Sequence, residues 1–223
     1  MSNRDRRPSF GRDSIWLASA DVVAVLLAFV GQLILARALL SESYGLFVIA
    51  IDLFATLFLL LDLGLPTLLA RDGPRKPSAI WSGMMRIYRF QGIAVLIFVP
   101  ISVSITLMQS VHDTLMLFGA GVALVHIASY APRTALRAAG DARFESLTKV
   151  IERIATTAGY GILFLINSTD VVVYASVFLL GAILGLSIAL VGAYRVCGKS
   201  GQRTASSESV SYTHLTLPTT STV

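Results

Sequence analysis

The chain has 223 residues, of which 55% are hydrophobic and only 14% charged, with a mean hydropathy of +0.73. Soluble domains carry about 25% charged residues, so this composition excludes an ordinary water-soluble enzyme and a disordered chain. The formal net charge is +5, but the basic residues are scattered between apolar segments, which argues against a nucleic-acid-binding module. A polytopic, all-α membrane protein fits these numbers. The single cysteine, Cys197, excludes an intrachain disulfide.

The first 13 residues form a basic tail that contains four arginines. No small-residue cleavage site follows a short apolar core, so this tail is not the start of a signal peptide. The apolar segment after it is predicted to remain in the membrane. We expect the tail itself to lie in the cytoplasm.

Six apolar segments are predicted to cross the membrane as helices, at residues 15–40, 44–63, 87–108, 114–131, 149–166 and 171–194. The third, fourth and sixth are almost free of charge, and each has about the 20 residues that a bilayer requires. The other three contain polar or charged residues. For a weak segment such as the second, the alternative is a re-entrant or buried helix.

The distribution of Lys and Arg supports six spans. Every one of the 18 except Arg37 lies in the N-terminal tail, at the link between the second and third spans, at the link between the fourth and fifth, or in the C-terminal segment. The links 109–113 and 167–170 carry none. Cytoplasmic loops are rich in Lys and Arg, so the alternation predicts a protein of the cytoplasmic membrane with both termini inside.

The C-terminal segment divides in two. Residues 210–219, VSYTHLTLPT, resemble the translation of a transposase adapter used in sequencing libraries. We therefore interpret 210–223 as adapter sequence, and we expect the natural gene to continue beyond residue 209. The segment 197–209 is interpreted as a cytoplasmic linker, and 14–196 as a six-helix transmembrane lobe. The alternative is a genuine polar tail, which would be disordered.

Polar side chains in the fifth span lie on one face of the helix. Lys149, Arg153, Thr156, Tyr160 and Asn167 stay within about 40° of one line. The opposite face is apolar. One interpretation is hydrogen bonding between helices; the other is a hydrated cavity wall with cations at its cytoplasmic end.

The fourth span adds Arg133 and Arg137, on the same face as His126. Either arginine alone would serve as an interface anchor, but with the two cations of the fifth span they predict a cationic cluster. The predicted substrate-binding residues are Arg133, Arg137, Lys149, Arg153, Tyr160 and Asn167.

Acids inside the membrane are costly and usually face a partner or water. Asp21 in the first span and Asp52 in the second are therefore candidate ion-coupling residues, and Asp52 is predicted to be buried. Asp62 is expected to be solvated. Gly181 and Gly185 form a GxxxG motif, which predicts close packing of helices. No catalytic motif, metal-ligand set or cofactor motif is present in the sequence, which argues against an enzyme.

Three segments resemble one family. They are LARALLSESYGLFVIA at 35–50, LDLGLPTLLARDG at 61–73 and PRTALRAAGDARFESLTKVIERI at 132–154. Together they resemble the N-terminal half of the polysaccharide-biosynthesis and oligosaccharide-flippase family, within the multidrug/oligosaccharidyl-lipid/polysaccharide exporter superfamily. Arg37, Tyr44 and Gly45 match its "LARxLGPxxYG" turn, although other residues replace the Gly-Pro. Gly64, Leu65 and Arg71 match its "GLxxALxR" motif.

The resemblance implies a fold of two six-helix lobes around a cavity, of which this chain supplies the first. It implies a flippase that moves a polyprenyl-pyrophosphate-linked oligosaccharide to the outer leaflet for surface polysaccharide biosynthesis. The implied partners are the lipid-linked oligosaccharide, membrane lipids and the C-terminal lobe, with no cofactor. One alternative is a cation-coupled multidrug exporter that uses Asp21. Another is a non-transporting membrane subunit or enzyme of a glycan pathway.

Overall fold

A computed structural model of the chain describes residues 10–61, 64–108 and 113–198. Over these residues the chain forms helices and no strand, which confirms the all-α prediction. The α-helices are α1 (Phe10–Ala38), α2 (Ser41–Leu61), α3 (Leu65–Asp72), α4 (Ile80–Met108), α5 (Asp113–Ala138), α6 (Ala142–Leu165) and α7 (Val171–Ala193). Most of the N-terminal tail, Asp62, and the linker and adapter segments from residue 199 onward lie outside the described residues.

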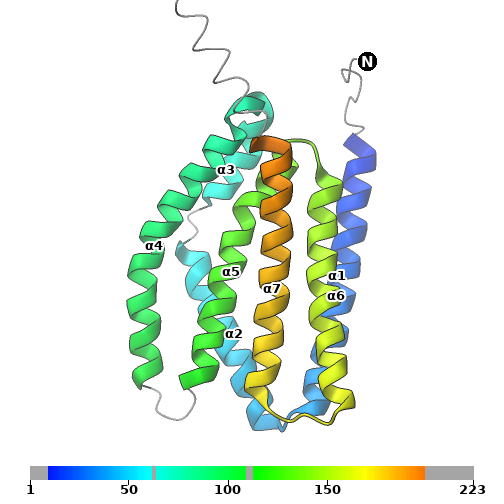
Figure 1. The fold of residues 1–223 in the computed structure, drawn as a ribbon, viewed down its shortest axis with the longest axis vertical. Coiled ribbons are helices and arrows are strands. Elements are labelled where there is room, and N and C mark those ends of the chain that lie inside the picture. Colours follow the sequence, from blue (N-terminus) through cyan, green and yellow to red (C-terminus); the bar gives the residue numbers. More distant parts are fainter. Residues whose placement is uncertain (1–9, 62–63, 109–112, 199–223) are drawn as a thin grey trace, which may run out of the picture.

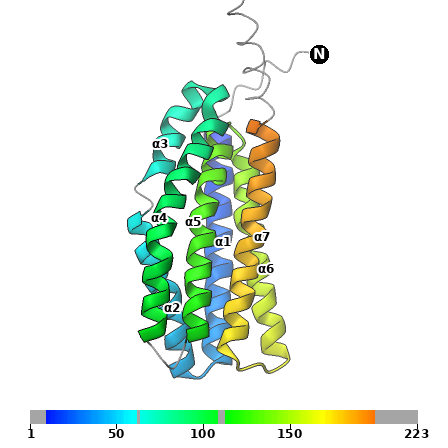
Figure 2. The same ribbon diagram turned by 60° about the vertical axis from the view of Figure 1, so that its left-hand side comes forward.

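The long helices run up and down beside one another in one bundle (Figure 1). Helix α5 occupies the middle and packs against α2, α3, α4, α6 and α7. Helix α4 lies at one side of the bundle in Figure 1 and α1 at the other, where its main neighbour is α6. Figure 2 shows the same bundle turned by 60°, with α1 behind α5 and α7. Because α1 contacts α2 only slightly, α6 is the element that holds α1 to the bundle.

Four helices are long and apolar enough to cross a membrane, at Ile15–Ala38, Pro77–Ser104, Thr114–Ala138 and Val171–Gly198. These correspond to the first, third, fourth and sixth predicted spans. The prediction of six crossing helices is therefore not confirmed. Helix α6 carries four charged residues between Glu145 and Arg153, which explains why its composition alone does not mark it as a span.

Three helix boundaries differ from the predicted ones. Helix α6 begins seven residues before the predicted Lys149, because the Asp141 side chain accepts a hydrogen bond from the Phe144 backbone N–H at 3.2 Å. Helix α5 continues through Pro132 to Ala138. The second predicted span ends with α2, and the chain turns at Gly64, which has a φ of 67°, before α3 begins.

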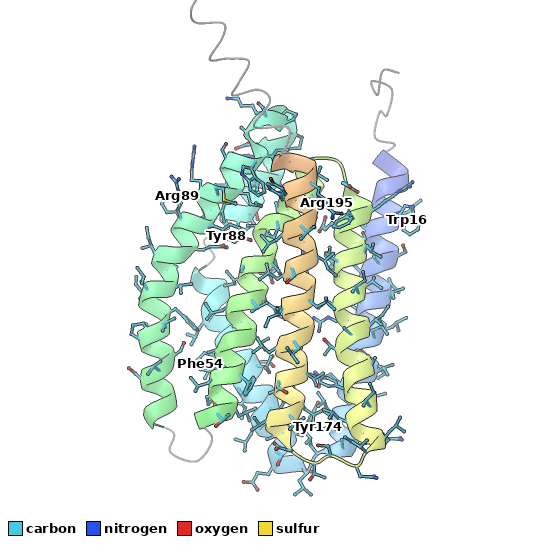
Figure 3. The ribbon with its side chains drawn as sticks, in the orientation of Figure 1. Trp16, Phe54, Tyr88, Arg89, Tyr174 and Arg195 are labelled. Atoms are coloured by element: carbon cyan, nitrogen blue, oxygen red, sulfur yellow. The ribbon has the colours of Figure 1, made fainter. Side chains whose placement is uncertain are left out.

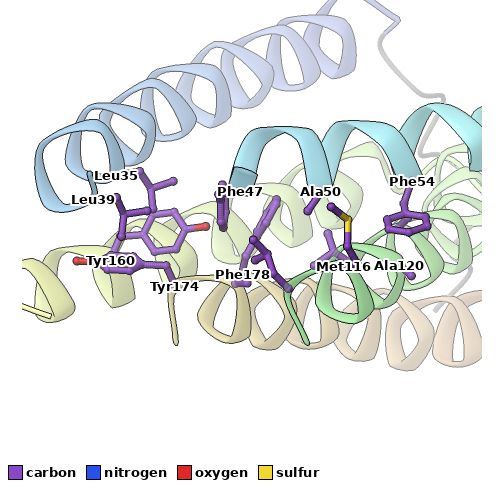
Figure 4. Packing of buried hydrophobic residues seen from close by; sticks show 14 of the residues in the cluster. Leu35, Leu39, Phe47, Ala50, Phe54, Met116, Ala120, Tyr160, Tyr174 and Phe178 are labelled. Carbon is purple, nitrogen blue, oxygen red and sulfur yellow. The ribbon is translucent and has the colours of Figure 1, made fainter. Parts of the chain in front are cut away.

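Aromatic and aliphatic side chains fill the space between the helices. A buried cluster runs along the bundle from Tyr160 and Tyr174, through Phe47 and Phe178, to Phe54 (Figure 4). Large apolar side chains also cover the outer surface, including Leu96 on α4 and Leu165 on α6, which are 74% and 79% exposed. An apolar exterior around a partly polar interior is the arrangement that a lipid environment favours.

Helix α7 approaches α6 closely at the predicted GxxxG motif. Gly181 and Gly185 are both buried in the α6–α7 contact. A Cβ atom added at Gly181 would overlap the Thr156 hydroxyl, and one at Gly185 would lie 2.5 Å from Glu152 Oε2. The packing role predicted for these glycines is thus confirmed, and their partner is the polar face of α6.

The two ends of the bundle differ in charge. The start of α1, helix α3, the α5–α6 link and the end of α7 lie at one end, whereas the α1–α2 and α6–α7 links lie at the other (Figure 1). Arg89 and Arg195 lie toward the first end, and Phe54 and Tyr174 toward the second (Figure 3). The fold therefore places at one end of the bundle the basic links that the alternation of Lys and Arg in the sequence assigned to one side of the membrane.

Candidate functional site

The polar face of α6 points into the bundle. Thr156 and Tyr160 are buried, Lys149 and Arg153 are partly buried, and the apolar residues Ile154 and Ile162 on other faces are exposed. The neighbours of α6 are α1, α5 and α7. The predicted stripe is thus an interior surface of the lobe, so its function depends on the groups opposite it.

Arg133 lies opposite an acid that sequence analysis did not single out. Its Nη2 donates to Oε2 of Glu152, whose side chain is 3% exposed. The other oxygen, Oε1, lies 3.1 Å from Nε2 of His126. The Arg133 side chain is 12% exposed. One buried carboxylate of α6 therefore binds two residues of α5.

A second ion-pair group joins α5, α6 and α1 near the basic end. Arg137 Nε donates to Glu145 Oε2 at 2.8 Å, and the Glu145 side chain is 1% exposed. Lys149 Nζ lies 3.5 Å from Glu145 Oε1 and 3.0 Å from Asp21 Oδ1. Asp21, a predicted ion-coupling residue, is thus an exposed partner of Lys149.

These contacts change the interpretation of the cationic cluster. Arg133, Arg137 and Lys149 each contact a carboxylate, so their charges are largely compensated within the lobe. The sequence did contain a signal for the missing acids: Glu145 and Glu152 are seven residues apart, which places them on one face of a helix. Glu145 also lies four residues before Lys149, a spacing at which opposite charges attract.

Arg153 differs from the other three cations. Among the residues that the structure describes, no carboxylate pairs with it. Its guanidinium lies 5.8 Å from the ring centre of Phe178, a cation–π distance. It lines a pocket between α1, α6 and α7 of about 30 Å³, together with Gln32 and Tyr160. That volume holds a water molecule but not a pyrophosphate.

The last two predicted substrate residues lie apart from the ion pairs. Tyr160 belongs to the buried cluster, and its ring centre is 5.6 Å from that of Tyr174 (Figure 4). Asn167 is exposed at the opposite end from the basic links, where it has a φ of 56° and donates its backbone N–H to Phe164 O at 3.0 Å. This left-handed conformation ends α6, a role for which asparagine is suited.

Comparison of the chain with known protein families finds a match. The family described as "Polysaccharide biosynthesis protein" matches residues 10–215. The chain belongs to the polysaccharide biosynthesis protein family. No curated protein and no solved structure matches the chain. The match includes every described helix, so the family resemblance found in the three sequence motifs is confirmed.

In this polysaccharide biosynthesis protein, Asp52 is exposed, and the prediction that it is buried is wrong. It lines a pocket of about 360 Å³ between α2 and α5, with Thr56, His126 and Tyr130. The His126 ring thus lies between this pocket and buried Glu152. Among the described residues, no group of three His, Cys, Asp or Glu side chains could hold a metal ion.

Proposed function

We propose that the chain is the N-terminal lobe of a flippase that moves a polyprenyl-pyrophosphate-linked oligosaccharide across the cytoplasmic membrane. In this proposal it is a transporter and not an enzyme, it uses no cofactor, and the C-terminal lobe of the same gene completes the cavity. The observation that carries the proposal is the family match over a helical bundle with a lipid-compatible exterior and a polar interior. Alternating access of the two lobes would move the substrate.

We also propose that α2 and α6 cross the membrane, which makes six spans. Support comes from the way both helices run alongside the four apolar ones (Figure 1). Helix α6 hides its acids against α5 and exposes apolar side chains outward. Paired charges inside a helical bundle are tolerated in a membrane because they do not face lipid.

The topology can be tested with single cysteines at exposed positions. Thr169→Cys lies in the α6–α7 link and Ser78→Cys precedes α4, at opposite ends of the bundle. In intact cells, an impermeant thiol reagent should label position 169 and leave position 78 unlabelled, because the basic end faces the cytoplasm. Both introduced cysteines should react after permeabilisation. The native Cys197 is buried, so we expect it to add little to the signal. Labelling at position 78 in intact cells would reverse the proposed orientation.

Arg153 is the cation that we propose for substrate binding. Arg133, Arg137 and Lys149 would have to leave buried or nearby carboxylates before they contacted a pyrophosphate. Arg153 has no such competitor among the described residues, and its pocket borders α1, which is held mainly by α6. Movement of α1 away from α6 would widen the pocket and expose a guanidinium suited to bidentate phosphate contact.

Arg153 substitutions test this role in a flippase-deficient strain that carries the gene together with its second lobe. Arg153→Ala should lower surface-glycan display about 10-fold or more, because a hydrogen bond to a charged group contributes about 1.5–3 kcal/mol. Arg153→Lys should give an intermediate loss, since the charge remains without the planar fork. Arg89→Ala removes one exposed cation of α4 and is the matched control. Normal display from Arg153→Ala at normal protein level would exclude Arg153 from the site.

The pocket that contains Asp52 supports a second candidate function for the chain, that of a cation-coupled multidrug exporter. An exposed acid in a pocket of a membrane helix can bind a cation, whereas Asp21 is already paired with Lys149. The same strains distinguish the two functions. Drug efflux that depends on Asp52, without an effect of the gene on glycan display, would favour the exporter.

A further inference from the structure

A groove on the outer side of the bundle, between α3 and α4, belongs to neither ion-pair group. Its volume is about 320 Å³. Its apolar wall includes Leu68 and Phe90, which are both exposed, and its rim includes Lys76 and Arg86. A groove with an apolar wall and a cationic rim has the chemical character of a site for an amphipathic anion.

The rim of the groove is net positive. It also contains Asp72, but this carboxylate is engaged by its neighbour: Arg71 Nε donates to Asp72 Oδ1 at 2.9 Å. Neither Lys76 nor Arg86 forms an ion pair within the described part of the chain. Two cations therefore line the groove without a carboxylate of their own.

The position of the groove along the membrane normal fits a lipid headgroup. Lys76 directly precedes the 28-residue apolar segment Pro77–Ser104, which is longer than the hydrocarbon core requires, so we place Lys76 at the level of the headgroups. Arg86 follows nine residues after Pro77, about 14 Å further along the helix axis. A guanidinium at that depth has to reach back toward the headgroups, or pair with an anion that reaches down.

We propose that this groove binds an anionic phospholipid of the leaflet at the basic end of the bundle. Lys76 and Arg86 contact the headgroup phosphate, and one acyl chain lies against Leu68 and Phe90. The charge of the rim selects an anionic headgroup, and the apolar wall requires a lipid rather than free phosphate. The site is independent of the flippase function, because no residue of the groove belongs to the polar face of α6.

Native mass spectrometry of the purified chain, with lipid added in detergent, tests the site. The wild-type chain should retain phosphatidylglycerol about 10-fold better than phosphatidylcholine. The double variant Lys76→Gln/Arg86→Gln should lose this preference. The matched control is Arg75→Gln/Arg89→Gln, which removes two exposed cations near the groove that do not line it. All three proteins should show the same thermal stability in detergent without added lipid, since none of the substituted cations forms an ion pair within the described residues.

Three outcomes would overturn the assignment. An equal loss in the control variant would show a general attraction of the basic end for anionic lipid. Equal retention of the two phospholipids by the wild-type chain would show that charge plays no part. Retention of polyprenyl phosphate without any retention of phosphatidylglycerol would assign the groove to the carrier lipid instead.

Discussion

The substitution Arg133→Met is expected to lower the free energy of unfolding of the chain by about 3–5 kcal/mol, because it leaves buried Glu152 without its arginine. Glu152 is 3% exposed, and its remaining partner would be His126. Methionine fills most of the space of the arginine stem, so the loss reports the uncompensated charge rather than a cavity. For a chain of this size, the loss corresponds to a fall in apparent Tm on the order of 10 °C.

The measurement is thermal unfolding of the purified chain in one detergent. The double variant Arg133→Met/Glu152→Gln removes both charges and should recover most of the lost stability, because a neutral amide is less costly to bury and can still bond to His126. If the single and double variants melt together, the ion pair does not stabilise the α5–α6 contact. Arg89→Met, on the exposed side of α4, controls for the loss of a positive charge at the surface.

Gly181→Leu is expected to separate α7 from α6 and to cost about 1–3 kcal/mol or more. A Cβ atom alone at this position would overlap the Thr156 hydroxyl and lie 3.5 Å from the Glu152 backbone oxygen. The Thr156 side chain can rotate, but a leucine would also meet the α6 backbone. The expected result is a lower Tm in detergent and a lower protein level in the membrane.

Gly161→Leu is the matched control for this substitution. Gly161 lies on α6, and a Cβ atom there would meet nothing within 4 Å. Leucine also has a higher helix propensity than glycine, so this variant should melt at or slightly above the wild-type temperature. A similar loss in both variants would mean that bulk at any glycine is harmful, and the close α6–α7 contact would then not be the cause.

These two contacts give α6 a central mechanical role. It binds α5 through Glu152 and Glu145, α1 through Lys149, and α7 through the glycine motif. A helix tied to its neighbours by buried charges and close packing moves with them as a unit, so we expect α5, α6 and α7 to stay together in the proposed alternating access. Helix α1 has one main neighbour, α6, and is therefore the edge of the bundle that the proposed widening of the Arg153 pocket would have to move.

The sequence by itself determined the class of protein and much of its layout. Low charge content and long apolar segments indicated a helical membrane protein, and the three motifs indicated the family. The alternation of Lys and Arg predicted which links share one end of the bundle. The GxxxG spacing predicted a close helix contact at Gly181 and Gly185. All of these features are properties of the linear sequence, because each depends on composition or on the spacing of residues along the chain.

Only the tertiary structure decided which charges are paired. Helical spacing places Lys149 and Arg153 on one face of α6. It does not say that Asp21, 128 residues away, reaches Lys149, or that no acid in the described part of the chain reaches Arg153. The exposure of Asp52 is also a property of the tertiary structure, because burial of a side chain depends on which helix packs against it. The energy of a charge in a membrane is set by its partner across a helix contact. That partner is fixed by how the helices pack, which the periodicity of a single helix does not contain.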